Sequence, residues 1–148
     1  MSMVKCISPI DGSVFAERPC LSEDQAFACA ARARAAQADW TLRPLQDRID
    51  LVRAGVAAIG AMNAEIVPEL AHQMGRPIRY GGEFGGFNER ASYMADIAAS
   101  ALAPTQIEDS DTFRRLIKRV PHGVVLGVAP WNYPYMTAIN TVAPALIA

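Results

Sequence analysis

The segment GVVLGVAPWNYP, residues 123–134, joins a β-strand pattern to a loop bounded by two prolines. Its first part, residues 124–129, is a short apolar run rich in β-branched residues, which is typical of a strand buried on both faces of a parallel sheet. The loop follows the carboxyl end of that strand, where open α/β sheets bind their ligands. The segment therefore predicts an α/β protein whose Rossmann-like parallel sheet begins at the C-terminal end of this chain.

Asn132 is the candidate functional residue of this loop, because Pro130 and Pro134 restrict the backbone on either side of it. Its side chain offers two N–H donors, and a rigidly held donor of this kind can stabilise a developing oxyanion. The alternative is that Asn132 only closes an Asx turn and Trp131 only packs. On spacing alone, that alternative is the more frequent one.

Upstream of this segment the patterns predict an N-terminal hairpin and then a layer of helices. Residues 4–17 form two short strands around turn residues, and Ser22 with Gln25 matches a capping box at the start of a helix. A second helix follows Pro44, because apolar residues recur at helical spacing at Leu45, Ile49, Val52, Val56 and Ile59.

A third helix ends at Gly75, and a fourth resumes after the glycine-rich stretch 81–86, whose role the pattern does not explain. Residues 112–120 mix apolar and basic side chains and predict an exposed, positively charged strand. A buried parallel strand requires neighbouring strands, and a crossover of roughly a dozen residues or more must connect it to each of them. The sequence contains only one candidate for such a strand. We therefore expect an incomplete domain, the front part of a larger α/β protein.

The composition excludes several classes of protein. The chain has 148 residues, of which 51% are hydrophobic and 20% charged, and its formal net charge of −1 gives no electrostatic case for a nucleic-acid partner. The chain has three cysteines, an odd number, and residues 1–9 show no secretory signal pattern. Both observations suggest a cytoplasmic protein. Residues 123–148 carry no charge, but three prolines argue against a membrane span, so no membrane partner is expected.

The histidines and cysteines show no pattern of a metal or nucleophile site. His72 and His122 have no second ligand at a metal-binding spacing, so we expect no metal. Cys6, Cys20 and Cys29 have no neighbouring histidine or basic cluster that would activate a thiol.

Residues 123–134 resemble the signature of the aldehyde dehydrogenase superfamily, whose members carry P-W-N-[FY]-P after a glycine-bounded strand. Weaker similarities occur in the same order along the chain. They are the entry at residues 8–12, Trp40 followed by Arg48, the turn at residues 75–77 and the approach at residues 119–123. Arg76 stands where the family usually has lysine.

The resemblance implies an NAD(P)-dependent oxidation of an aldehyde to a carboxylic acid through a cysteine thiohemiacetal. By motif position, Asn132 is the oxyanion-hole residue and Tyr133 lines the aldehyde tunnel. The residues along the cofactor, NAD or NADP, are Val128, Ala129, Pro130 and Trp131. Family members are dimers or tetramers, so a homo-oligomer is implied for the full-length protein.

The resemblance also divides the chain. Residues 1–111 form the N-terminal hairpin and helices of the cofactor-binding domain, residues 112–122 the strand that bridges to an oligomerisation element, and residues 123–148 the start of the parallel-sheet core. None of the three cysteines matches the family's nucleophile, and its general base lies beyond residue 148, so this chain alone is expected to be inactive.

The alternative is a non-catalytic binding or oligomerisation module derived from a dehydrogenase. The identity of the aldehyde and the choice between NAD and NADP remain open at this stage.

Overall fold

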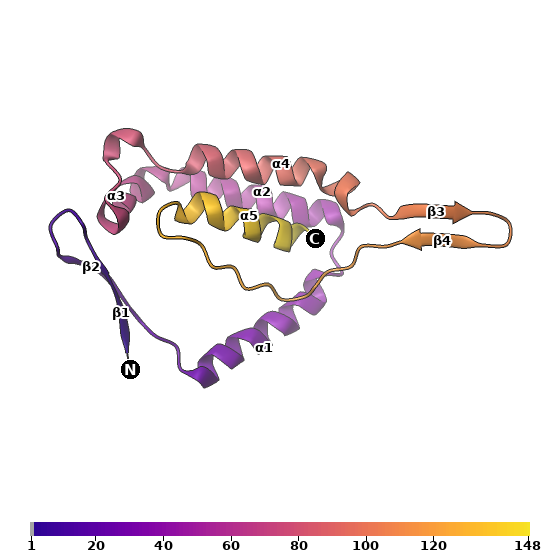
Figure 1. Ribbon diagram of the computed structural model, residues 1–148, viewed down its shortest axis with the longest axis horizontal. Helices are drawn as coiled ribbons and strands as arrows, with labels where there is room; N and C mark the ends of the chain where they lie inside the picture. Colours follow the sequence, from indigo (N-terminus) through magenta and orange to yellow (C-terminus); the bar gives the residue numbers. More distant parts are fainter. Residues whose placement is uncertain (1) are drawn as a thin grey trace.

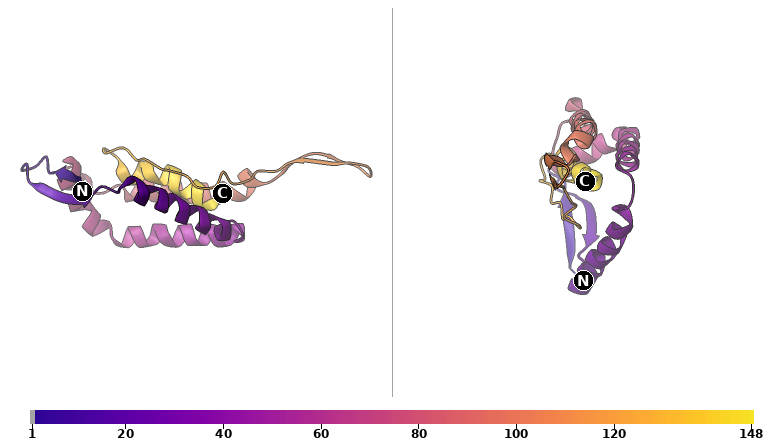
Figure 2. Two further views of the ribbon diagram at one scale, coloured as in Figure 1. Left: turned by 90° about the horizontal axis from the view of Figure 1, so that it is seen from below. Right: turned by 90° about the vertical axis from the view of Figure 1, so that its right-hand side faces the viewer.

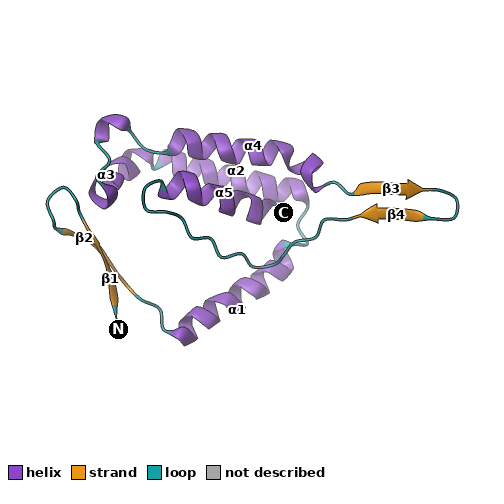
Figure 3. Cartoon of the chain, viewed as in Figure 1, coloured by secondary structure: helices purple, strands orange, loops and turns teal. Residues whose placement is uncertain are grey.

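Helices dominate the chain, and two short antiparallel hairpins flank them (Figures 1 and 3). The computed structural model describes residues 2–148, so Met1 lies outside the described part. The elements in chain order are β1 (Met3–Ile7), β2 (Val14–Pro19), α1 (Glu23–Trp40), α2 (Leu45–Ala61), α3 (Asn63–Met74), the 3-10 helix η1 (Ile78–Tyr80), α4 (Phe84–Leu102), β3 (Thr105–Asp109), β4 (Arg114–Ile117) and α5 (Pro134–Ile147).

The hydrophobic core lies between α2, α4 and α5, which run side by side (Figure 1). The stripe predicted on α2 is confirmed, since Ile49, Val52 and Val56 are buried and Leu45 and Ile59 pack against the same cluster. Small side chains allow close helix packing. On α4 they are Ala91, Ala95 and Ala98, and on α5 Ala143.

The N-terminal hairpin is also confirmed, with β1 antiparallel to β2. It docks on α3 through Ser8, which is buried and whose Oγ lies 3.5 Å from Nδ1 of His72. The ring of Phe15 stacks on His72 with the ring centroids 5.0 Å apart. His72 therefore has a structural role in the described part of the chain.

Helix α1 begins with the predicted capping box. The Gln25 amide donates to Ser22 Oγ at 3.2 Å, and the Ser22 amide donates to Gln25 Oε1 at 2.9 Å. No residue of α1 is buried. Its last residue, Trp40, donates its indole N–H to the Leu146 carbonyl at 2.8 Å, and Arg48 Nε donates to the Ile147 carbonyl at 3.0 Å. These two donors satisfy carbonyl groups that the end of α5 leaves without helical partners.

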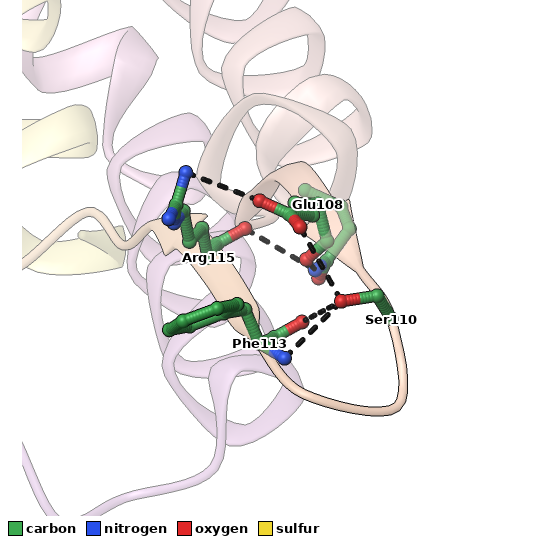
Figure 4. A network of polar contacts seen from close by, with 5 residues as sticks. Glu108, Ser110, Phe113 and Arg115 are labelled. Carbon is green, nitrogen blue, oxygen red and sulfur yellow. Dashed lines mark hydrogen bonds and ion pairs between the residues drawn. The ribbon is translucent and has the colours of Figure 1, made fainter.

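The strand predicted within residues 112–120 is confirmed as β4, whose antiparallel partner β3 was not predicted. The β3–β4 hairpin projects away from the helices (Figure 2). At its tip, Arg115 lies 3.1 Å from Glu108 as an ion pair, and the Phe113 amide donates to Ser110 Oγ at 3.1 Å (Figure 4). Polar contacts within the hairpin thus define its turn.

The apolar run 124–129 forms no strand within residues 2–148, which differs from the sequence prediction. Residues 118–133 instead pass as an extended loop from β4 to α5 (Figure 3). The physical reason is that a parallel strand is stable only beside hydrogen-bonded neighbours, and no strand of the described residues lies beside this run. Apolar side chains such as Leu126 and Val128 are consequently exposed.

Among the described residues, no single helix is both long and apolar enough to cross a membrane. Helices α2 and α3 satisfy length and composition only together, as a pair bent by 71° at their junction.

Gly75 ends α3, as predicted, with φ of 77° in the left-handed region. A Cβ at this position would lie 3.2 Å from Cγ of Pro9 in the β1–β2 turn. We expect Gly75→Ala to lower the free energy of unfolding by about 1–2 kcal/mol, because a side chain disfavours left-handed backbone. Urea titration of the chain measures this, with Gly75→Asn as the milder control, since asparagine tolerates that backbone better. Equal midpoints for Gly75→Ala and the unchanged chain would contradict the prediction.

Candidate functional site

The loop that carries Asn132 leads directly into the first turn of α5. Trp131 is 77% exposed and Val128 is 87% exposed, so neither residue packs into the described part of the chain. Asn132 is exposed as well, and its side chain makes no hydrogen bond within residues 2–148. The described residues therefore leave the donors of the Asn132 side-chain amide unused.

The Asx-turn alternative for Asn132 is not observed. An Asx turn requires the side-chain oxygen to accept an N–H two residues later, and that residue is Pro134, which has no N–H. The packing alternative for Trp131 is not observed in the described residues either, because its ring is mostly exposed.

Arg76 holds the backbone of this loop. Its Nη2 donates to the main-chain carbonyl of Asn132 at 3.0 Å. The same guanidinium lies over the ring of Tyr133, 4.6 Å from the ring centroid, in a cation–π contact. One side chain from the segment after α3 therefore contacts two consecutive residues of the loop.

Glu83 links Arg76 to the start of α5. The Glu83 carboxylate is 1% exposed, and Oε1 lies 2.9 Å from Nη1 of Arg76 as an ion pair, although the pair is not aligned as a hydrogen bond. The other oxygen, Oε2, accepts the backbone N–H of Met136 at 2.7 Å. A carboxylate is favourable at a helix N-terminus, because it satisfies a free amide and complements the helix dipole.

Glu83 replaces a local cap on α5. Tyr133 at the N-cap position makes no side-chain cap, and Pro134 in the first turn has no N–H. Burial raises the pKa of Tyr135, and the charges of Glu69 and Glu83 raise it further.

Gly86, in the glycine-rich stretch 81–86, lies against the side chain of Met136. A Cβ on Gly86 would lie 2.7 Å from Sδ of Met136, which belongs to a flexible side chain that can move aside. The contact shows that the start of α4 lies beside the start of α5.

The cysteines and histidines form no second site in the described residues. Cys6 contacts the Gln73 carbonyl, and Cys29 accepts a hydrogen bond from Arg32 at 3.0 Å. Within residues 2–148 no group of three His, Cys, Asp or Glu side chains could hold a metal ion.

Sequence reasoning singled out Asn132 but missed Arg76 and Glu83 as its neighbours. Arg76 was visible only as a departure from a family pattern, and Glu83 lies inside the glycine-rich stretch. The only signal in the sequence was a charged residue in a segment otherwise made of small and aromatic residues.

Comparison with known proteins identifies the family. The model of the aldehyde dehydrogenase family matches residues 1–148. NADP-dependent glyceraldehyde-3-phosphate dehydrogenase of Pisum sativum is 30% identical over 78% of this chain and 25% of its own length, and the Triticum aestivum protein of the same name gives the same values. This chain thus spans about a quarter of the curated relatives it matches.

Solved structures agree. NADP-dependent glyceraldehyde-3-phosphate dehydrogenase from Bacillus halodurans C-125, solved with NADP, is 27% identical with a TM-score of 0.88. The match covers 99% of this chain and 32% of that one. A NAD-dependent benzaldehyde dehydrogenase from Corynebacterium glutamicum is 26% identical with a TM-score of 0.81, over 99% of this chain and 32% of the other.

These matches confirm the fold class as an incomplete domain of helices and small sheets that corresponds to part of a larger dehydrogenase fold. The P-W-N-Y-P loop, the helical core and the match over residues 1–148 lead to one conclusion: this chain belongs to the aldehyde dehydrogenase family.

Proposed function

We propose that residues 1–148 form the N-terminal part of an NAD(P)-dependent aldehyde dehydrogenase that oxidises an aldehyde to a carboxylic acid. In this reaction a cysteine thiolate attacks the carbonyl carbon, the resulting alkoxide is stabilised while hydride leaves, and water then releases the acid. The nucleophile and the base belong to the part of the relatives that this chain does not cover. This chain supplies residues that bind the cofactor and the aldehyde and that stabilise the negative charge of the alkoxide.

One observation carries the proposal. The Asn132 side chain is exposed and makes no hydrogen bond to the described residues, while Arg76 holds its backbone carbonyl. An amide N–H that is held by its backbone and not used internally fits an oxyanion hole, where donors must be in place before charge develops. Asn132 therefore donates to the alkoxide oxygen of the thiohemiacetal.

The residues before Asn132 fit the cofactor. Val128 and Trp131 present exposed apolar surface, and Ala129 and Pro130 between them leave the backbone accessible. Pockets for small molecules combine such apolar walls with a few polar backbone groups. When bound, NAD or NADP supplies the hydride acceptor. Tyr133 lines the aldehyde tunnel, and its ring is held by Arg76.

The β3–β4 hairpin contains, as β4, the strand that bridges to the oligomerisation element. Its exposed apolar side chains include Ile107, Phe113 and Ile117, and an isolated two-stranded hairpin is marginal in water unless another surface covers it. A second subunit would provide that surface in a dimer or tetramer.

The test uses the polypeptide that carries this sequence in its native source. Intact-mass measurement establishes its length, and aldehyde-dependent formation of NADH or NADPH is followed by absorbance across aliphatic, aromatic and phosphorylated aldehydes. We expect a polypeptide much larger than 16.0 kDa, or a complex with a complementing chain, that reduces one of the two cofactors. A native 16.0 kDa protein that has no complementing chain and oxidises no aldehyde would overturn the proposal.

A further inference from the structure

The segment between α3 and α4 reaches the Asn132 loop through a single guanidinium. Arg76 contacts three groups at once: the Asn132 carbonyl at 3.0 Å, the Tyr133 ring at 4.6 Å and Glu83 Oε1 at 2.9 Å. The planar guanidinium can do this because it has donors on several edges and a flat face for stacking. These contacts restrain the backbone on the carbonyl side of Asn132. The two prolines, in contrast, restrict only the backbone torsion angles of the loop.

This arrangement is shielded from solvent. The side chain of Arg76 is 12% exposed, and that of Glu83 1% exposed. The other long-range ion pair of the helical core, Arg53 with Asp96, has the same chemistry at 2.7 Å but lies at the surface, with side chains 48% and 65% exposed. Exposed pairs contribute little to structure, whereas removing one partner of a buried pair leaves an uncompensated charge.

Glu83 also ties the arrangement to a rigid element. Its second oxygen accepts the Met136 amide at 2.7 Å, so one carboxylate joins the first turn of α5 to Arg76, which contacts the loop. A shift of Arg76 would therefore move the loop relative to α5.

We propose that Arg76, held by Glu83, is a positioning residue that fixes the Asn132 backbone and so sets where the Asn132 side chain leaves the loop toward the oxyanion hole. The part of this inference that concerns catalysis rests on the proposed function above. The part that concerns order does not, because the contacts exist in this chain whatever Asn132 binds.

The experiment measures local order in the 148-residue chain by NMR. The variants are Arg76→Met, Arg76→Lys and the double variant R76M/E83Q, with Arg53→Met as the matched surface control. The readouts are the order parameter of the Asn132 backbone N–H and the hydrogen exchange of the Met136 backbone N–H. Exchange in α2 reports the stability of the whole fold.

For Arg76→Met we expect the Asn132 backbone N–H to become mobile, because the hydrogen bond from Arg76 to the Asn132 carbonyl is lost. Exchange at Met136 should accelerate by about 10- to 100-fold, more than in α2, because Glu83, which accepts that N–H, is left as an unpaired buried charge. Arg76→Lys should restore part of the order, because an ammonium group can still pair with Glu83 but cannot also stack on Tyr133. Arg53→Met should change neither readout. If Arg76→Met fails to fold, R76M/E83Q removes both charges and should show the same loss of Asn132 order.

Unchanged order at Asn132 in a folded Arg76→Met or R76M/E83Q chain would overturn the proposal. Acceleration of equal size at Met136 and in α2 would also overturn it, because it would show a general effect on stability only. Failure of the proposed function looks different: Asn132 would lose its order in these variants, yet substituting Asn132 would leave aldehyde oxidation unchanged.

Discussion

Substitution of Asn132 by alanine should lower kcat by about 10²- to 10³-fold in the native polypeptide that oxidises aldehyde, a loss of about 2.7–4 kcal/mol in transition-state stabilisation. The amide is exposed and makes no hydrogen bond within the described residues, so its removal leaves no unsatisfied partner in this chain. The lost interaction forms only when the carbonyl oxygen acquires charge. We therefore expect KM for the aldehyde to change much less than kcat.

Two variants make the test of Asn132 specific. Asn132→Asp keeps the size of the side chain but replaces the N–H donors with a negative charge, so it should be at least as inactive as Asn132→Ala. Asn140→Ala alters an exposed asparagine on α5, outside the loop, and should leave kcat unchanged. If Asn132→Ala keeps kcat within about twofold of the unchanged enzyme, Asn132 is not an oxyanion-hole donor.

Phe87→Ala should destabilise the 148-residue chain by about 3–5 kcal/mol. Phe87 is the largest side chain in the buried cluster of α2, α4 and α5, and it also lines an apolar cavity of about 400 Å³ beside Trp40 and Ile139. Truncation would remove buried apolar surface and enlarge that cavity. Because domains are stable by only about 5–15 kcal/mol, much of the fold's stability would be lost. Urea unfolding followed by circular dichroism measures the change.

The matched control for Phe87 is Phe27, which lies on α1 and is 66% exposed. Phe27→Ala should change the free energy of unfolding by no more than about 0.5 kcal/mol, because surface substitutions away from special contacts have small effects. Phe87→Leu should lie between the two alanine variants. Equal losses for Phe27→Ala and Phe87→Ala would show that the buried cluster of α2, α4 and α5 does not hold the fold together.

Several features could be predicted because their causes are local in the sequence. The capping box joins Ser22 and Gln25, three residues apart, and the buried stripe of α2 follows from helical spacing alone. The left-handed end of α3 follows from a glycine at position 75. The P-W-N-Y-P loop was likewise visible as a contiguous motif, and the family match over residues 1–148 supports its identification.

The strands show where local reasoning ends. β4 was predicted from its mixture of apolar and basic residues, but β3 has a polar, acidic sequence and is a strand only because β4 pairs with it. The opposite happened at residues 124–129, where the side chains predict a strand and the described residues contain no neighbour for it. Pairing depends on a partner, which periodicity within one segment does not specify.

The surroundings of Asn132 depend on contacts between distant segments. Arg76 and Asn132 are 56 residues apart, and Glu83 and Met136 are 53 residues apart. Short-range rules of torsion, capping and apolar spacing set the individual helices, the N-terminal hairpin and the proline-bounded loop. They do not say which charged side chain will be buried beside which loop, because that choice follows from how α4 and α5 pack. The amino-acid sequence alone thus specified Asn132 and its flanking prolines. Only tertiary packing placed Arg76 against this loop and Glu83 against Arg76.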